Sequence, residues 1–378
     1  MIKTIFEQQH LTGIQTLRGL AAFMVVLEHI RFLSCGAFGV DIFFCISGFM
    51  IMLSTHENTQ YFLRKRLLRI VPFYALMTIG SYLLMVLFPG MFEQSLASFD
   101  KLVKSLLFIP FDMGNGILQP LLRIGWTVNC EILFYLLFFL AFHISHKYRG
   151  LLCSLFLLGF VMLGAFVSGG ATFLGTDLTT ANIPIFFAHM FPVIQENGNT
   201  FVSSWLAPLF FYGNPVMLEF ILGILCYYIV KFLYDKFSGI TTSSRQITGW
   251  GALLMGGILF VYLIISTNDT NIVGYHRLLH WGLPVMLLVI LFCLAGLCLS
   301  LPKPLIRLGD ISFSLYLIHY YPIMFLDRNV FDFATLRPLS FIGALLGITL
   351  VLFLSMGTWY FVEKKLTGWL RMRILPAK

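Results

Sequence analysis

The sequence predicts an all-α fold: a polytopic membrane helix bundle with about ten transmembrane helices (range about nine to eleven). Hydrophobic residues make up 58% of the 378 residues and charged residues only 11%. The mean hydropathy is +0.88, which excludes an ordinary soluble domain. The apolar residues form long unbroken runs rather than the alternating pattern of a transmembrane barrel, so helices are the expected way of crossing the bilayer.

Apolar runs follow one another along the chain, and each is long enough for one helix to span a membrane. They cover residues 13–33, 38–54, 70–89, 125–144, 150–168, 215–231, 249–267, 281–300, 311–326 and 339–361. The interval 169–214 is apolar but broken by Gly, Pro and polar residues, and residues 183–193 within it are a candidate re-entrant or eleventh segment. Residues 92–122 mix Asp100 and two lysines with apolar residues, which indicates an interfacial helix on the outer side.

The Lys and Arg residues predict the orientation of the bundle. A cytoplasmic N-terminus brings most of the 25 basic residues to the inner ends of the spans, as the positive-inside rule requires, and puts both termini in the cytoplasm. We therefore expect a cytoplasmic segment at residues 1–12, one integral-membrane domain at 13–362 and a basic cytoplasmic tail at 363–378. Because the net charge of +8 sits at helix ends, we expect the lipid bilayer as a partner and no nucleic acid.

The seven cysteines predict neither a metal site nor a disulfide framework. They lie mostly inside apolar runs and lack the paired spacing of zinc ligands. We expect them to act as small buried hydrophobic residues, and we expect no metal in the protein.

Arg18 and His29 lie inside the first apolar run. They are about three helical turns apart, roughly 16 Å along the axis, and share one face. A charge in a membrane helix costs several kcal/mol unless it faces a protein interior or a wet cavity, so such residues indicate function. The alternative for Arg18 is a side chain that reaches back to the interface. His29 fits that alternative poorly, because Glu28 and Arg31 make a polar cluster around it.

Two arginines precede the third span, in the run YFLRKRLLRIVP. Arg66 and Arg69 are three residues apart, so their guanidinium groups project from one helical face. Such a pair can bind a pyrophosphate or ribose phosphate with paired hydrogen bonds. The alternative is that these charges serve only topology and anionic lipid.

The fourth span begins with GWTVNCEILFY and therefore carries Trp126, Asn129 and Glu131 inside the membrane. A carboxylate at this depth must be protonated, paired with a cation such as Arg18, or bonded to an imidazole. A purely structural ion pair is the alternative. Other polar residues in the spans, each more often a helix-packing residue than a ligand, are Asp41, Ser47, Glu219 and His319.

Five sequence runs together resemble the acyltransferase 3 family of bacterial membrane acyltransferases, especially its exopolysaccharide and O-antigen O-acetyltransferases. The runs are LRGLAAFMVVLEH, GVDIFFCISGFMI, RLLR before IVPFY, GWTVNCEILFY and RLGDISFSLYLIH, and they occur in the order typical of the family. The resemblance covers residues 13–362.

The resemblance implies transfer of an acyl group, commonly acetyl, from cytoplasmic acyl-CoA to a sugar hydroxyl. The acceptor would be an extracytoplasmic carbohydrate or glycolipid, and the enzyme would lie in the bacterial inner membrane. It implies His29 as catalytic residue with Arg18 as companion, and CoA contacts at Arg66 and Arg69. Trp126 is a further candidate for binding acyl-CoA. Acyl-CoA is then a co-substrate, and no tightly bound cofactor is expected.

For the chemistry, we expect neutral His29 to remove the proton of the sugar hydroxyl as it attacks the thioester. Glu131 or Glu28 would orient the ring, as the carboxylate of a hydrolytic triad does. Asp41, Ser47, Asn129 and His319 are candidate supporting residues. Direct transfer and an acyl-imidazole intermediate both remain open.

Two other function classes compete with this one. A secondary transporter or sugar-lipid flippase would also carry intramembrane Arg, Glu and His residues. Against it, the two halves of the chain lack internal similarity, and the paired arginines precede a span instead of lying at mid-membrane. A non-catalytic scaffold would not depend on His29.

Overall fold

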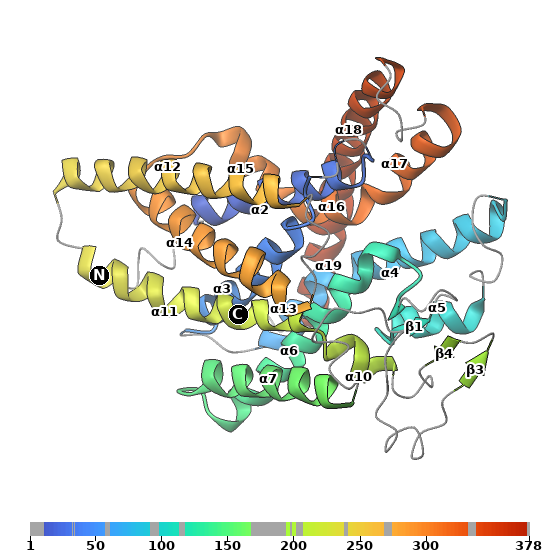
Figure 1. Ribbon diagram of the computed structural model, residues 1–378, viewed down its shortest axis with the longest axis horizontal. Coiled ribbons are helices and arrows are strands. Elements are labelled where there is room, and N and C mark those ends of the chain that lie inside the picture. The colour runs from blue at the N-terminus through green and yellow to red at the C-terminus, as the bar shows by residue number, and fades with distance from the viewer. Residues whose placement is uncertain are drawn as a thin grey trace. The chain divides into compact units, whose positions relative to one another are not determined.

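The computed structural model describes residues 11–31, 33, 35–56, 61–90, 98–112, 118–167, 194–196, 199–201, 207–237, 241–267, 274–331 and 338–375. These residues are mainly helical, with two short antiparallel hairpins (Figure 1). The chain divides into two compact units, each described by itself. The first unit comprises Met1–Thr59, Glu219–Ile272 and Leu279–Lys365. The second comprises Gln60–Leu218, Val273–Leu278 and Leu366–Lys378.

Among the described residues, seven helices are long and apolar enough to cross a membrane, and a shorter apolar helix covers Gly39–Ser54. This confirms the predicted class of polytopic helical membrane protein. The helix in the predicted span at 13–33 is shorter than predicted, because α2 ends at Glu28. The predicted span at 311–326 is divided at His319 into two seven-residue helices. The candidate re-entrant segment at 183–193 lies outside the described residues.

The first unit is built from helices that pack around α2. Its elements are α2 (Thr12–Glu28), α3 (Gly39–Ser54), α11 (Glu219–Phe237), α12 (Thr242–Ser266), α14 (Leu283–Cys298), α15 (Lys303–Asp310), α16 (Ser312–Ile318), α17 (Tyr320–Leu326), η6 (Asp327–Phe331) and α18 (Pro338–Thr358). Helix α2 contacts α3, α14, α15 and α16, while α12 runs along α14 and α11 along α3 (Figure 1). Two π-helical segments, η5 (Leu278–Gly282) and η7 (Trp359–Leu366), cross the boundaries between the units.

Glycines let α2 approach its neighbours at backbone distance. A Cβ added at Gly19 would come 2.7 Å from the Gly309 nitrogen, and one added at Gly13 would come 1.8 Å from the Phe292 carbonyl oxygen. Buried apolar side chains that join the C-terminal half of α2 to α16, α17 and α18 form one core: Ala22, Val26, Ile30, Leu315, Ile323, Ala344 and Val351. Close backbone contact of this kind is typical of helix packing in membranes. There, small residues let helices approach closely, and van der Waals packing replaces the hydrophobic effect as the driving force.

The cysteines are free thiols, and Cys45, Cys130, Cys153, Cys226 and Cys293 are buried. The Sγ atoms of Cys45 and Cys226 lie 3.7 Å apart where α3 meets α11. For these five residues the prediction of small buried hydrophobic side chains is confirmed. Cys35 and Cys298 are half-buried.

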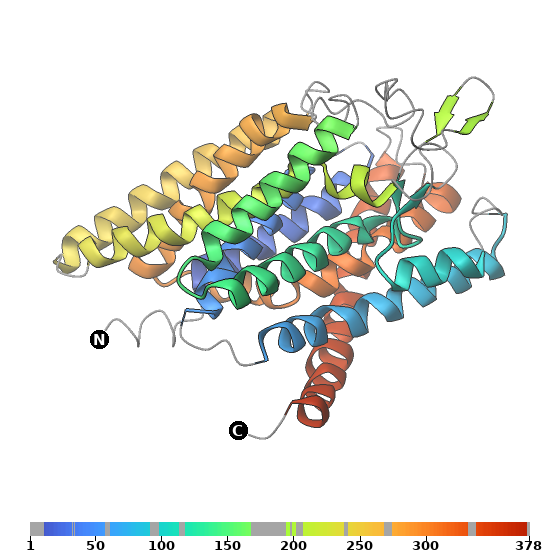
Figure 2. The ribbon, with the colours of Figure 1, turned by 90° about the horizontal axis from the view of Figure 1, so that it is seen from below.

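The second unit centres on α4 and α6. Its elements are α4 (Phe62–Leu87), α5 (Phe99–Leu106), β1 (Phe111–Asp112), β2 (Leu118–Gln119), η2 (Arg123–Gly125), α6 (Trp126–Ile144), α7 (Arg149–Val167), β3 (Ile194–Glu196), β4 (Asn199–Phe201), α10 (Ala207–Tyr212), η4 (Pro215–Leu218), α13 (Gly274–Arg277) and α19 (Thr367–Ile374). Helix α4 contacts α5, α6 and α19, and α6 also contacts α7. The long blue α4 and the teal α5 lie side by side in Figures 1 and 2.

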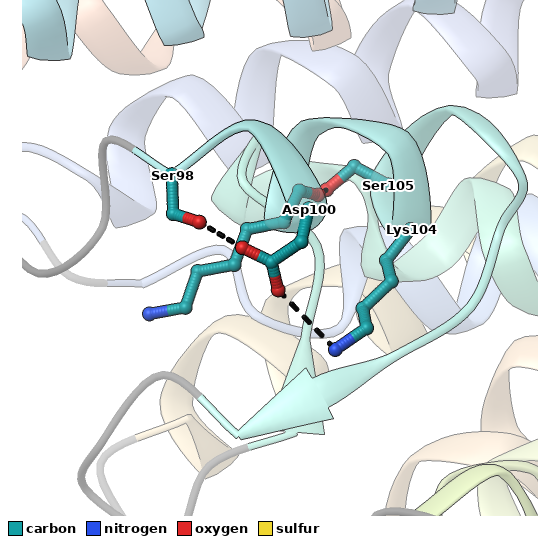
Figure 3. Close-up of polar contacts among 5 residues, drawn as sticks. Ser98, Asp100, Lys104 and Ser105 are labelled. Carbon is teal, nitrogen blue, oxygen red and sulfur yellow. Dashed lines mark hydrogen bonds and ion pairs between the residues drawn. The ribbon is translucent and has the colours of Figure 1, made fainter.

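Helix α5 is the helix predicted within residues 92–122. On its polar side, Asp100 accepts a hydrogen bond from Ser98 and pairs with Lys104 at 3.4 Å (Figure 3). On its other side, Ser105 is buried and accepts a hydrogen bond from the Leu121 backbone at 2.9 Å. A short helix with one charged and one buried face suits a position along an interface, and its place on the outer side stays a prediction.

Candidate active site

The first unit brings two histidines together. His29 is half-buried at the C-terminal end of α2, and His319 is 0% exposed between α16 and α17. The Nδ1 atom of His29 and the Nε2 atom of His319 lie 3.2 Å apart, and the ring centroids lie 4.7 Å apart. The Tyr320 ring meets His29 edge-on with its centroid at 5.5 Å. The predicted base therefore has a second, fully buried imidazole directly against it.

Each of these rings is also held by a backbone carbonyl of its own helix segment. His29 Nδ1 lies 2.9 Å from the carbonyl oxygen of Val25, and His319 Nδ1 lies 2.6 Å from that of Tyr316. Because a carbonyl oxygen only accepts hydrogen bonds, these two contacts restrict where the ring protons can be. The rings are thereby oriented before any substrate arrives.

Arg18 is held through an amide bridge to a different helix. Its Nη1 atom donates to Gln15 Oε1 at 3.2 Å, and Gln15 Nε2 donates to Asp310 Oδ1 at 2.8 Å. Asp310 ends α15, the helix that lies against α2 at Gly19. The Arg18 guanidinium is thus half-buried and hydrogen-bonded within the first unit, and its predicted role as companion of His29 stays a prediction.

The chain just after α2 is held by polar contacts on both sides. The Gly36 backbone donates to Glu28 Oε2 at 2.7 Å, and Arg31 pairs with Asp327 of η6 at 3.0 Å. Partial burial and the nearby Glu28 carboxylate raise the pKa of the Cys35 thiol. Glu28 therefore holds the loop beyond His29, and its predicted role in orienting the imidazole stays a prediction.

Three further predicted residues lie on α3 and α11. Asp41 and Glu219 are buried in the first turns of these helices, where the helix dipole favours negative charge. Ser47 is half-buried further along α3. The structure places all three in the helix contacts of the first unit, and a role in the chemistry stays a prediction.

In the second unit the paired arginines lie beside Glu131 and a tyrosine. The Arg66 guanidinium lies over the rings of Phe62 and Tyr135, 5.9 and 5.5 Å from their centroids. The Tyr135 hydroxyl donates to Glu131, and both Arg66 and Arg69 act on that hydroxyl electrostatically. One partner of Glu131 is thus a tyrosine of its own helix. Its predicted pairing with Arg18 or His29 stays a prediction.

A third arginine reaches the same face of α4. Helix α19 contacts α4, and Arg371 lies close enough to Arg69 for the two like charges to repel each other. Like charges brought together on one surface favour binding of an anion between them. The predicted basic tail therefore contributes Arg371 to the arginine cluster.

Asn129 is a buried amide that lacks hydrogen-bond partners within the described part of the chain. Its side chain is 0% exposed, and both the amide nitrogen and the amide oxygen are without such partners there. Leaving a buried polar group unpaired costs about 1–3 kcal/mol. Trp126 is half-buried at the start of the same helix. An amide in this state suits a ligand that supplies both a donor and an acceptor.

Comparison with known proteins decides the family. The family described as an acyltransferase domain matches residues 11–360. The chain belongs to the acyltransferase 3 family. As a member of that family it is an acyltransferase.

Three relatives of this acyltransferase are about a quarter identical to it over the aligned residues. Exopolysaccharide production protein ExoZ of Rhizobium meliloti is 26% identical over 84% of this chain and 86% of its own length. Acyltransferase MdmB of Streptomyces mycarofaciens is 25% identical over 84% of this chain and 79% of its own length. O-acetyltransferase OatA of Staphylococcus aureus is 26% identical over 47% of this chain and 34% of its own length. No solved structure matches the chain significantly.

Several contacts of this acyltransferase were missed by reasoning from its sequence. The run RLGDISFSLYLIH contains both Asp310 and His319, but nothing in it says that they reach Gln15 and His29. Tyr135 had a usable signal, because it lies four residues after Glu131 on one helix and such pairs meet.

Proposed function

We propose that this acyltransferase moves an acyl group, commonly acetyl, from cytoplasmic acyl-CoA to a sugar hydroxyl on the other side of the bacterial inner membrane. The acceptor would be an extracytoplasmic polysaccharide or a lipid-linked glycan. The observation that carries the proposal is the imidazole of His29, held in place against His319 in a chain of this family. The printed names of ExoZ and OatA, which concern exopolysaccharide and O-acetyl transfer, support the acceptor class.

The arginine cluster of the second unit is the proposed contact for the nucleotide part of acyl-CoA. Arg66 and Arg69, with Arg371 beside them, offer guanidinium groups whose fork geometry matches phosphate oxygens. Asn129 supplies a donor and an acceptor for the amides of the pantetheine arm, and Trp126 at the start of the same helix supplies an aromatic surface. Acyl-CoA acts as co-substrate, and the proposal requires no tightly bound cofactor.

The proposed reaction is direct acyl transfer with His29 as general base. His29 takes the proton of the sugar hydroxyl while the hydroxyl oxygen bonds to the thioester carbonyl carbon. The carbon–sulfur bond then breaks, and the leaving thiolate takes the proton from the imidazolium, so the products are an ester and free CoA. Arg18, held by Gln15, supplies positive charge on the same helix face. An acyl-histidine intermediate is the competing route.

Purified protein in detergent tests the proposal. Acetyl-CoA labelled in the acetyl group is mixed with alkali-deacetylated cell-surface polysaccharide, and free thiol and polymer-bound label are measured together. We expect both to appear in equal amounts and His29→Ala to abolish both. If the wild-type protein binds acetyl-CoA but releases no free thiol, the proposal is contradicted and the transporter class is favoured.

The same assay separates the two routes. Label that stays on the protein without acceptor, and is lost in His29→Ala, indicates acyl-histidine. Label that reaches the polymer without ever being trapped on the protein indicates direct transfer.

A further inference from the structure

His319 is a buried ring whose protons can be assigned from its contacts. Its Nδ1 atom lies 2.6 Å from the Tyr316 carbonyl oxygen, which can only accept. Nδ1 of His319 therefore carries a proton. The ring is 0% exposed, and burial disfavours the charged form. Neutral His319 has one ring proton, so its Nε2 atom is left with a lone pair and acts as an acceptor.

The proton on His29 then follows from the same reasoning. Its Nδ1 atom faces two acceptors, the Val25 carbonyl oxygen at 2.9 Å and the His319 Nε2 atom at 3.2 Å. A lone pair at this position would face two other lone pairs, so Nδ1 of His29 must carry the proton. In the neutral ring, Nε2 of His29 is therefore the basic nitrogen.

We infer that His319 is a positioning residue for the transfer reaction, which accepts a hydrogen bond from His29 Nδ1 and holds His29 Nε2 as the base. The inference rests on the proposed function. It gives His319 the place that a carboxylate has in a hydrolytic triad, where the third member sets the tautomer and stabilises the imidazolium. Here the third member is a neutral imidazole.

A neutral partner has a physical advantage at this position. A buried carboxylate would itself need a counter-charge or several donors in the membrane. An imidazole needs only one donor partner for its lone pair and one acceptor for its proton, and His29 and Tyr316 supply these. When His29 becomes charged, its Nδ1 proton still points at the His319 lone pair, which stabilises the imidazolium.

Two variants of His319 test the inference in the acetyl-transfer assay. His319→Leu removes the acceptor, and we expect kcat to fall by about 100-fold or more, the scale of general-base catalysis. The KM for acetyl-CoA should change by less than about threefold, because the lost contact acts on the base and not on substrate binding. His319→Gln keeps an acceptor oxygen, and we expect it to restore kcat to within about tenfold of wild type.

His143 provides a matched control. Its Nδ1 atom lies 2.8 Å from the Phe139 carbonyl oxygen, the same contact to the residue four positions before that His29 makes with Val25. His143 is exposed, so His143→Leu should leave kcat and KM unchanged. A loss of activity in this variant equal to that of His319→Leu would overturn the inference.

Nitrogen NMR of the wild-type protein gives a readout that is independent of activity. The nine histidines are labelled with nitrogen-15, and the His29 signals are identified by their absence in His29→Gln. At alkaline pH we expect a pyrrole-type signal for His29 Nδ1 and a pyridine-type signal for His29 Nε2. The reverse pattern overturns the inference, as does full activity in His319→Leu. If the wild-type protein transfers no acetyl group, the proposed function fails, but the NMR signals still show which ring nitrogen of His29 carries the proton.

Discussion

At the scale of single residues, α2 and its C-terminal end carry two of the predicted site residues, Arg18 and His29, and each contacts a different neighbour. His29 depends on His319, a neutral acceptor. Arg18 depends on Gln15, whose amide in turn depends on the Asp310 carboxylate. A planar guanidinium that is oriented by hydrogen bonds loses less entropy when it binds a developing negative charge. If Arg18 takes part in the reaction as proposed, Asp310 acts on it through Gln15 and Arg18.

Changing Asp310 should consequently have a graded effect. Asp310→Ala leaves the Gln15 amide without its acceptor, and we expect kcat to fall several-fold, since one hydrogen bond is worth about 1 kcal/mol. Asp310→Asn keeps an acceptor oxygen, so its kcat should stay close to wild type. Arg18→Ala should lower kcat far more than either. An equal loss in Asp310→Asn and Asp310→Ala would show that the charge of Asp310, and not its acceptor oxygen, is what matters.

The arginine cluster is the second argument at this scale. Arg66→Ala with Arg69→Ala should raise the KM for acetyl-CoA by about tenfold or more and change kcat less, because contacts to the nucleotide are the same in ground and transition states. With S-acetylpantetheine, which lacks the nucleotide phosphates, the double variant and wild type should behave alike. Lys65→Ala removes an exposed charge on the same helix and serves as control. A defect that persists with S-acetylpantetheine would refute phosphate binding.

At the scale of elements, backbone contacts between α2 and its neighbours position the active-site residues. Gly19 lies one residue after Arg18, at the point where α2 meets α15. Asp310, which holds Gln15, ends α15. The contact between these two helices therefore sets the distance across which the Gln15 bridge must reach.

A methyl group at Gly19 should separate α2 from α15. Its carbon would lie 2.7 Å from the Gly309 nitrogen and 2.9 Å from the Leu308 carbonyl carbon, and both are backbone atoms that cannot turn away. We expect Gly19→Ala to lower stability by about 1–3 kcal/mol and to reduce kcat, measured by thermal unfolding and the transfer assay. At Gly80 of α4 an added Cβ meets nothing within 4 Å, so Gly80→Ala should be neutral or stabilising by up to about 1 kcal/mol. Equal effects of both variants would contradict close packing at Gly19.

How much the sequence predicts also depends on scale. The helices, the polar residues inside them and the spacing of Arg66 and Arg69 are local features, so hydropathy and helical periodicity are enough to predict them. The contact between His29 and His319 joins positions 290 residues apart, and no local pattern encodes it. The roles of Tyr135 and Arg371 were not predicted for another reason. A tyrosine in an apolar run is normally interpreted as a packing residue, and an arginine in a tail as a topology signal.

At the scale of the whole molecule, the proposed function needs the two ends of α2 on opposite sides of the membrane. The proposed donor, acyl-CoA, is cytoplasmic and the proposed acceptor is not, so the proposal places His29 toward the outer surface. The loop after His29, held by Glu28 and by the pair of Arg31 with Asp327, would then face outward. The basic tail that includes Arg371 would face the cytoplasm.

Labelling of cysteines in intact cells tests this orientation. With the other cysteines replaced by serine, Cys35 in that loop should react with a membrane-impermeant maleimide. In a second variant, Met372→Cys at an exposed tail position should react only after the cells are opened.

The rate of Cys35 labelling should also depend on pH. Burial and the Glu28 carboxylate raise the pKa of the Cys35 thiol, so less thiolate is present at neutral pH and labelling should accelerate as the pH rises. Glu28→Gln removes one cause of the raised pKa and should speed labelling at neutral pH. Labelling of the tail but not of Cys35 in intact cells would invert the molecule, put His29 at the cytoplasmic surface and rule out transfer to an acceptor outside.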